Sequence, residues 1–110
     1  MADIPHPTRI SMPATAKRGD IIDIKTLIQH EMETGYRRDA NGRVIPRDIV
    51  ARFEVRYLDQ IIFAADTFAG VSANPYFAFS TIAGDSGSLT FTWTDLAGRK
   101  TVETRSLTVT

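Results

Sequence analysis

Apolar and polar residues alternate along several short stretches of this 110-residue chain. Period two is the spacing of a β-strand that has one packed face and one solvated face. The clearest stretch covers residues 47–58, and we predict a strand there. Its apolar positions are Ile49, Ala51, Phe53, Val55 and Tyr57, and the charged positions between them are Arg52, Glu54 and Arg56.

The same spacing predicts further strands. Residues 21–29 place Ile22, Ile24, Thr26 and Ile28 on one face, and residues 88–94 do the same with Leu89, Phe91 and Trp93. Shorter strands are expected at 8–12, 61–66, 76–83 and 101–109. In the last of these, Glu103 and Arg105 share the parity of the apolar Leu107 and Val109, which a β-bulge or an edge position would explain.

Glycine, proline, asparagine and aspartate mark the connections between these strands. Tight turns are expected at Asp59-Gln60, at residues 84–87 and at residues 95–98. The long polar stretch 30–47 contains Asn41-Gly42, which favours a small hairpin within it. No segment has apolar residues at helical spacing over three turns. We therefore predict a single all-β domain over residues 1–110, an immunoglobulin-like two-sheet antiparallel sandwich of about seven strands.

The charge balance and the absence of cysteine narrow the possible functions. Thirteen Lys and Arg residues balance thirteen Asp and Glu residues, whereas nucleic-acid binders usually carry a basic excess. Without cysteine there is no disulfide, no thiolate metal site and no cysteine nucleophile. The first residues lack the basic and apolar regions of an export signal, and no apolar run reaches membrane-spanning length. We expect no nucleic-acid partner and no membrane association.

Two short motifs invite a functional interpretation and are better explained as turns. Residues 84–87 read Gly-Asp-Ser-Gly, as around a serine protease nucleophile, but that chemistry needs a histidine and an aspartate held in one constellation. Residues 18–20 read Arg-Gly-Asp, an integrin-binding tripeptide, and lie between two predicted strands. An enzyme that uses Ser86, or a metal at His30, remains an alternative. We expect no catalytic residue.

The long polar stretch holds the other candidate chemistry. His30, Glu31, Met32 and Glu33 fall short of a zinc ligand set, because His6 is the only other histidine. We expect no metal and no cofactor, and the stretch stays a candidate contact surface. Guanidinium groups could attract an anion here, or could form an ordinary solvated face. The arginines are Arg37, Arg38, Arg43 and Arg47.

An ordered set of short segments resembles the SoxZ family of bacterial thiosulfate oxidation. The segments are Arg9-Ile10-Ser11, residues 13–17, Ile24-Lys25-Thr26-Leu27-Ile28, His30 with residues 32–35, Val44-Ile45-Pro46-Arg47, residues 71–76 and Phe91-Thr92-Trp93-Thr94-Asp95. They span nearly the whole chain in the family's order. One departure is Glu31, where the family commonly has proline after the histidine, so the loop is expected to be less rigid.

The resemblance implies a non-catalytic subunit in a periplasmic heterodimer with SoxY, whose C-terminal cysteine arm carries sulfur intermediates to the other sulfur-oxidation enzymes. A cysteine-free chain cannot be the covalent carrier, and export together with its partner would explain the missing signal. Trp93 fits a core position or an interface. The alternative is a stand-alone immunoglobulin-like binding or adhesion module. We expect the partner or docking surface to include His30, Met32, Glu33, Arg37, Arg38, Asn74, Tyr76 and Trp93.

Overall fold

The computed structural model describes residues 7–29, 38–44, 49–67 and 75–110. All the regular structure in these residues is β-strand. The strands are β1 (Thr8–Ser11), β2 (Thr15–Ala16), β3 (Ile21–Ile28), β4 (Val50–Tyr57), β5 (Gln60–Asp66), β6 (Tyr76–Ile82), β7 (Gly87–Asp95) and β8 (Lys100–Val109). The strands predicted from alternation are confirmed within these residues. The strand predicted over 47–58 begins at Val50, and its residues 47 and 48 lie outside the described ranges. β2 is a two-residue strand that the pattern did not indicate.

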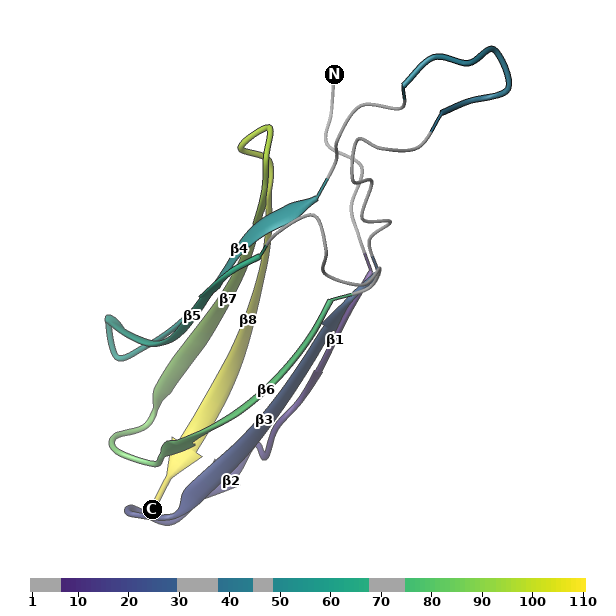
Figure 1. Cartoon of the computed structure of the whole chain (residues 1–110). Helices are drawn as coiled ribbons and strands as arrows, with labels where there is room; N and C mark the ends of the chain where they lie inside the picture. The colour runs from purple at the N-terminus through teal and green to yellow at the C-terminus, as the bar shows by residue number, and fades with distance from the viewer. Residues whose placement is uncertain (1–6, 30–37, 45–48, 68–74) are drawn as a thin grey trace.

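The strands form two sheets that pack face to face as an immunoglobulin-like sandwich (Figure 1). One sheet has the order β1-β3-β6 and the other β2-β8-β7-β4-β5. Neighbouring strands are antiparallel except for β2, which runs parallel to the end of β8. The predicted all-β sandwich is therefore correct, and the parallel pair is an addition to it.

The core lies where the alternating faces of the two sheets meet. The predicted inward residues of β3 and β7 are buried, and so are Phe53 and Val55 of β4, each 0% exposed. Four aromatic rings bridge the layers around Phe53, whose ring centroid lies 5.0 Å from that of Phe77 and 4.9 Å from that of Trp93. Phe63 completes the cluster at 5.9 Å from both Phe53 and Phe77. Burial of this apolar surface is the main favourable term for folding.

The start of β4 departs from strict alternation. The pairing of β4 with β7 shifts between Val50 and Arg52, so Ala51 is the extra residue of a bulge. Val50 is consequently buried at 2% exposure and Ala51 only half-buried, which corrects the expectation that Ala51 shares the inward face of Phe53. Thr67 joins this region, because its N–H donates to the Ala51 carbonyl at 2.8 Å and its hydroxyl to the Val50 carbonyl.

In β8 the charged Glu103 and Arg105 lie on the same face as the buried Leu107, and the edge position of the strand explains this. Its pairing with β7 is continuous from Lys100 to Leu107, so there is no bulge. On its other side β8 pairs with β2 only at Thr108 and Val109. The rest of β8 is thus an edge of the described sheet, where the half-buried Glu103 and Arg105 can reach water.

Turns connect the strands where small and polar residues predict them, except that one turn lies one residue earlier than expected. The β4–β5 hairpin turns on Leu58 and Asp59, with φ of 53° and 61°, which is one residue earlier than Asp59-Gln60. Positive φ at both central residues is the pattern of a type I′ turn, whose twist matches the flanking strands. The 95–98 turn is confirmed, and Asp95 Oδ1 accepts the N–H groups of Ala97 and Arg99 at 2.9 Å.

Candidate docking surface

Of the residues expected at a partner surface, the structure describes Arg38, Tyr76 and Trp93, and places them in three separate regions. The remaining ones lie outside the described residues, so their role stays a prediction. These are His30, Met32, Glu33, Arg37 and Asn74.

Trp93 lies in the core, which corrects its assignment to the docking surface. The side chain is 1% exposed, because the odd-numbered residues of β7 face the opposite sheet. Its ring lies 6.5 Å from that of Phe91 and packs on Phe53. The indole Nε1 is buried and has no hydrogen-bond acceptor among the described residues. The core interpretation of Leu89, Phe91 and Trp93 is therefore confirmed.

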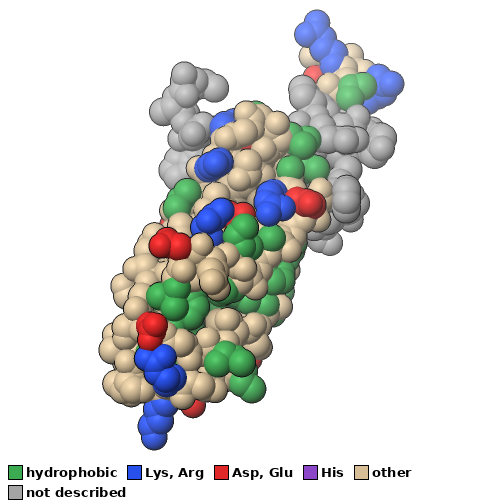
Figure 2. All heavy atoms as spheres, turned by 90° about the vertical axis from the view of Figure 1, so that its left-hand side faces the viewer, with side chains coloured by type: hydrophobic (Ala, Val, Ile, Leu, Met, Phe, Trp, Pro, Cys, Tyr) green, Lys and Arg blue, Asp and Glu red, His purple; other side chains and the backbone are tan. Residues whose placement is uncertain are grey.

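Arg38 lies on a projecting hairpin tip, residues 38–44, far from the core (Figure 1). Arg38 and Val44 form a β-bridge, and the Gly42 N–H donates to the Asp39 carbonyl at 3.0 Å. Asp39 Oδ1 also accepts the N–H of Arg43 at 3.0 Å. The small hairpin predicted at Asn41-Gly42 is confirmed. Basic side chains extend from this tip into solvent (Figure 2).

Tyr76 lies on the outer face of the three-stranded sheet, where the register brings it beside other exposed side chains. It is 57% exposed and stands opposite Leu27 of β3, which in turn stands opposite Arg9 of β1. The next row on this face contains Ser11, Lys25 and Ala78. At the far end of the same face Ile21 and Ile82 are cross-strand partners, exposed at 73% and 64%.

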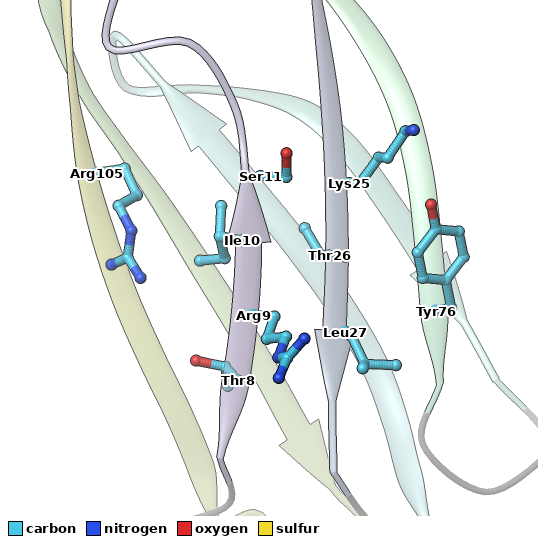
Figure 3. A pocket seen from close by; sticks show the side chains of 9 residues that line it. All are labelled: Thr8, Arg9, Ile10, Ser11, Lys25, Thr26, Leu27, Tyr76 and Arg105. Carbon is cyan, nitrogen blue, oxygen red and sulfur yellow. The ribbon is translucent and has the colours of Figure 1, made fainter.

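A hollow of about 610 Å³ lies along β1 at this end of the sheet (Figure 3). Arg9 and Lys25 contribute positive charge, Tyr76 an aromatic ring and Leu27 an apolar floor. Arg105 of β8 lines the inner side of β1, beside Thr8 and Ile10. The hollow combines cationic and aromatic groups and holds no described titratable acid, so it suits an anionic or amphipathic segment better than a basic one.

Of these residues, Tyr76 is predicted from the sequence to lie at the docking surface, whereas Arg9, Lys25 and Leu27 are not. A signal was present, since Ile21 and Leu27 are large apolar residues on the face that the alternation assigned to solvent. Exposed apolar side chains that gather on one face mark interaction sites in soluble proteins. Only the pairing of β1, β3 and β6 shows that these residues from distant segments share one surface.

The two turn motifs have structural roles. Ser86 Oγ accepts the N–H of Val109 at 2.7 Å and donates to the carbonyl of the same residue at 3.2 Å, which ties the 84–87 turn to the end of β8. Gly19 has φ of 89°, and its N–H donates to the Ala83 carbonyl at 2.9 Å. Both histidines lie outside the described residues. Within the described ranges no cluster of three or more potential metal ligands occurs.

The outer face of the five-stranded sheet carries ion pairs beside exposed apolar side chains such as Ile61 and Val102. Figure 2 shows charged side chains of both signs dispersed over this side of the molecule. Arg52 links two carboxylates, with Nη1 at 3.0 Å from Asp66 Oδ1 and Nη2 at 3.4 Å from Glu54 Oε1. Arg56 Nε donates to Glu54 Oε2 at 3.2 Å. The hydrogen bond from Arg56, together with that from Arg52, lowers the pKa of Glu54 below its ordinary value of 4.5.

This network gives a testable pH dependence. A carboxyl whose pKa is lower in the folded than in the unfolded protein stabilises the fold above its unfolded pKa, and this stabilisation is lost as the pH falls through the folded pKa. The substitution Glu54→Gln should therefore flatten the decline of thermal stability below about pH 4.5. Differential scanning calorimetry between pH 2 and pH 7 measures the melting temperature of each variant. The matched control is Asp59→Asn, in the β4–β5 turn, which should keep the wild-type decline of thermal stability at acid pH. If Glu54→Gln also kept that decline, the ion pairs of Glu54 would not be its cause.

The family is shown by a match over most of the chain. A family model described as "Sulphur oxidation protein SoxZ" matches residues 10–106. The chain belongs to the SoxZ family. The resemblance seen in the ordered sequence segments is thereby confirmed, and a sulfur-oxidation carrier complex is the setting that this family indicates.

Solved structures confirm the fold of this SoxZ-family chain. The sulfur carrier protein SoxY from Chlorobium limicola f thiosulfatophilum superimposes with a TM-score of 0.64 at 10% identity, covering 94% of this chain and 78% of that chain. A superoxide reductase (neelaredoxin) from Ignicoccus hospitalis gives 0.69 at 12% identity, covering 96% and 81%. At identities this low, the superpositions show that the sandwich fold is shared and say nothing about activity. No curated protein matches the sequence. No described segment forms a helix long and apolar enough to span a bilayer.

Proposed function

We propose that this chain is the non-catalytic SoxZ-type subunit of a sulfur carrier complex in the periplasm, bound to a SoxY-type chain. In this proposal the SoxY-type arm carries the sulfur intermediate on its cysteine, and this chain supplies part of the surface that the sulfur-oxidation enzymes recognise. The observation that carries the proposal is the family match over residues 10–106. The absence of cysteine supports assigning the carrier role to the SoxY-type chain, because this chain has no thiol that could hold sulfur covalently.

The charge pattern of the surface also supports a binding role. The chain has no net charge, so no overall field opposes association with another protein. Exposed apolar residues lie on the outer face of the three-stranded sheet, at Ile21, Tyr76 and Ile82. The exposed cations Arg9 and Lys25 lie near Tyr76 and provide local steering for an anionic group. We further propose that the sulfur-oxidation enzymes bind transiently at the hairpin tip, residues 38–44, and at the Arg9 and Lys25 part of the hollow along β1.

The test is assembly with SoxY. Co-expression of this chain with an affinity-tagged SoxY from the same organism should yield a stable one-to-one complex on the tag. Sedimentation velocity should show the 12.2 kDa chain moving with its partner at micromolar concentration. Replacing SoxY by an unrelated immunoglobulin-like domain is the control and should leave this chain in the flow-through. A well-behaved monomer without affinity for SoxY would instead favour a stand-alone binding or adhesion module.

A further inference from the structure

The two lateral sides of the sandwich differ in how their edge strands are protected. On one side β1 carries Arg9, and β8 carries Lys100, Glu103 and Arg105. The other side is formed by β5 and β6, which lie together because the Phe63 ring of β5 stacks 4.5 Å from the Phe79 ring of β6. β6 contains no charged residue. Charged side chains are a usual means by which edge strands avoid pairing with other chains, and β6 lacks it.

The hydrogen-bonding pattern of β6 shows which of its backbone groups lie at the outer edge of the described sheet. The Ala83 N–H donates to the Asp20 carbonyl at 2.9 Å, and the Ile28 N–H donates to the Pro75 carbonyl at 3.3 Å. In an antiparallel pair the residues that bond to one neighbour alternate along the strand, so the odd-numbered residues of β6 bond to β3. The N–H and C=O groups that point away from β3 are those of Tyr76, Ala78, Ser80 and Ile82.

β5, on the same side, is less suited than β6 to pair with a strand of another chain. Its pairing with β4 shifts between Val55 and Arg56, so Ile62 forms a bulge. A bulge interrupts the regular spacing that a strand added from outside would need. Its last residue, Asp66, is held by Arg52. By contrast, the β3–β6 pairing is continuous from Ile21 to Leu27, and β6 borders its sheet without a bulge (Figure 1).

The side chains on the outer face of β6 leave room for an incoming strand. Tyr76 and Ile82 stand at its two ends, exposed at 57% and 64%. The small Ala78 and Ser80 lie between them. An extended apolar segment beside β6 would gain main-chain hydrogen bonds along the edge and cover both large side chains.

We infer that the outer edge of β6, which pairs with no further described strand, is the docking site for an edge strand of the SoxY-type partner, which extends the three-stranded sheet across the interface. The inference rests on the proposed function and specifies its surface. The fold comparison favours this occupant, because SoxY from Chlorobium limicola has a sandwich that superimposes on 94% of this chain and so has sheet edges of its own. Two sandwiches of one fold can join edge to edge in a pseudo-symmetric pair.

Proline at Ala78 tests the inference with little effect on this chain's own sheet. The Ala78 N–H points away from β3, and proline is tolerated at edge positions whose N–H faces outward. Ala78→Pro removes one donor from the open edge and blocks close approach of a strand. Isothermal titration with SoxY should show affinity lowered at least about tenfold. Circular dichroism should report an unchanged strand content.

Two controls match this variant. Thr8→Pro places proline at the opposite border of the same sheet, where the bond from the Gln29 N–H to the Pro7 carbonyl sets the phase so that the Thr8 N–H also points outward. It should bind SoxY as the wild type does. Ala78→Val enlarges the side chain but keeps the N–H, and should retain most of the affinity. Equal binding by Ala78→Pro and wild type would overturn the edge inference while leaving the SoxY complex intact. A wild type that does not bind SoxY would overturn the proposed function itself.

Hydrogen exchange supplies a readout that needs no variant. On addition of SoxY, the amides of Tyr76, Ala78, Ser80 and Ile82 should become protected, while those of Thr8 and Ile10 in β1 should not. Protection that appears in the β1 amides alone would place the interface on the other side of the sheet and refute the inference. Protection of the β6 amides in the isolated chain, rising with its concentration, would assign the edge to a second copy and equally refute it.

Discussion

Phe53→Ala is expected to lower the free energy of unfolding by about 3–5 kcal/mol. Phe53 is fully buried at the centre of β4 and contacts rings from both sheets. Removing its ring leaves a cavity that the surrounding strands can close only in part. Since small domains are stable by about 5–15 kcal/mol, this loss is a large share of the total.

Urea unfolding followed by tryptophan fluorescence measures the effect, because Trp93 packs against Phe53 and reports on the same region. Thr104→Ala, at an exposed position of β8, is the control and should change the stability by less than about 1 kcal/mol. A loss below about 1 kcal/mol for Phe53→Ala would mean that the inner face of β4 is not the centre of the core.

Tyr57→Phe is expected to cost about 1–3 kcal/mol although it removes only one oxygen atom. Tyr57 is 5% exposed, and its hydroxyl donates to the Asp85 carbonyl and accepts the Gly84 N–H at 3.2 Å. These bonds tie the end of β4 to the β6–β7 turn. The substitution leaves two backbone groups without their partner, and this penalty exceeds the small apolar gain of phenylalanine.

The matched control is Tyr76→Phe, which makes the same chemical change on the exposed outer face. Its effect on thermal unfolding should stay within about 0.5 kcal/mol. If both substitutions proved equally mild, the Tyr57 hydroxyl would have no special role in holding the turn. Because the β6–β7 turn also carries Ser86, which bonds to Val109, a marked effect of Tyr57→Phe should extend to faster amide exchange at the end of β8.

Local rules predict most of the strands because most of them pack one face against the core and expose the other. In β3 and β7 the side chains alternate over the whole length, so period two identifies both the strand and its buried residues. The residue types at the turns also predict where the strands end. Gly42 and Gly98 adopt positive φ at hairpin turns that their neighbours Asn41 and Asp95 also indicate.

Alternation fails where the structure depends on a partner strand. The Ala51 bulge arises from the register of β4 against β7, and it moves Val50 into the core without any change in the local pattern. β2 pairs through two residues only, so its own sequence carries almost no signal. Trp93 could be assigned to the core or to an interface from its spacing, and the aromatic cluster formed with β4 placed it inside.

Residue types and their spacing are enough to predict the all-β class, the inward residues of β3 and β7, the burial of Phe53 and Val55 in β4, the absence of a thiol carrier on this chain and the resemblance to the SoxZ family. These follow from residue types and near-neighbour spacing, which act locally along the chain. The strand pairing in the folded chain is needed to show which strands border the sheets, which amides of β6 point outward and which residues of β1, β3 and β6 share one face. Edges and shared faces arise from pairings between residues distant in sequence, such as Ile21 with Ile82, and no local pattern specifies those pairings.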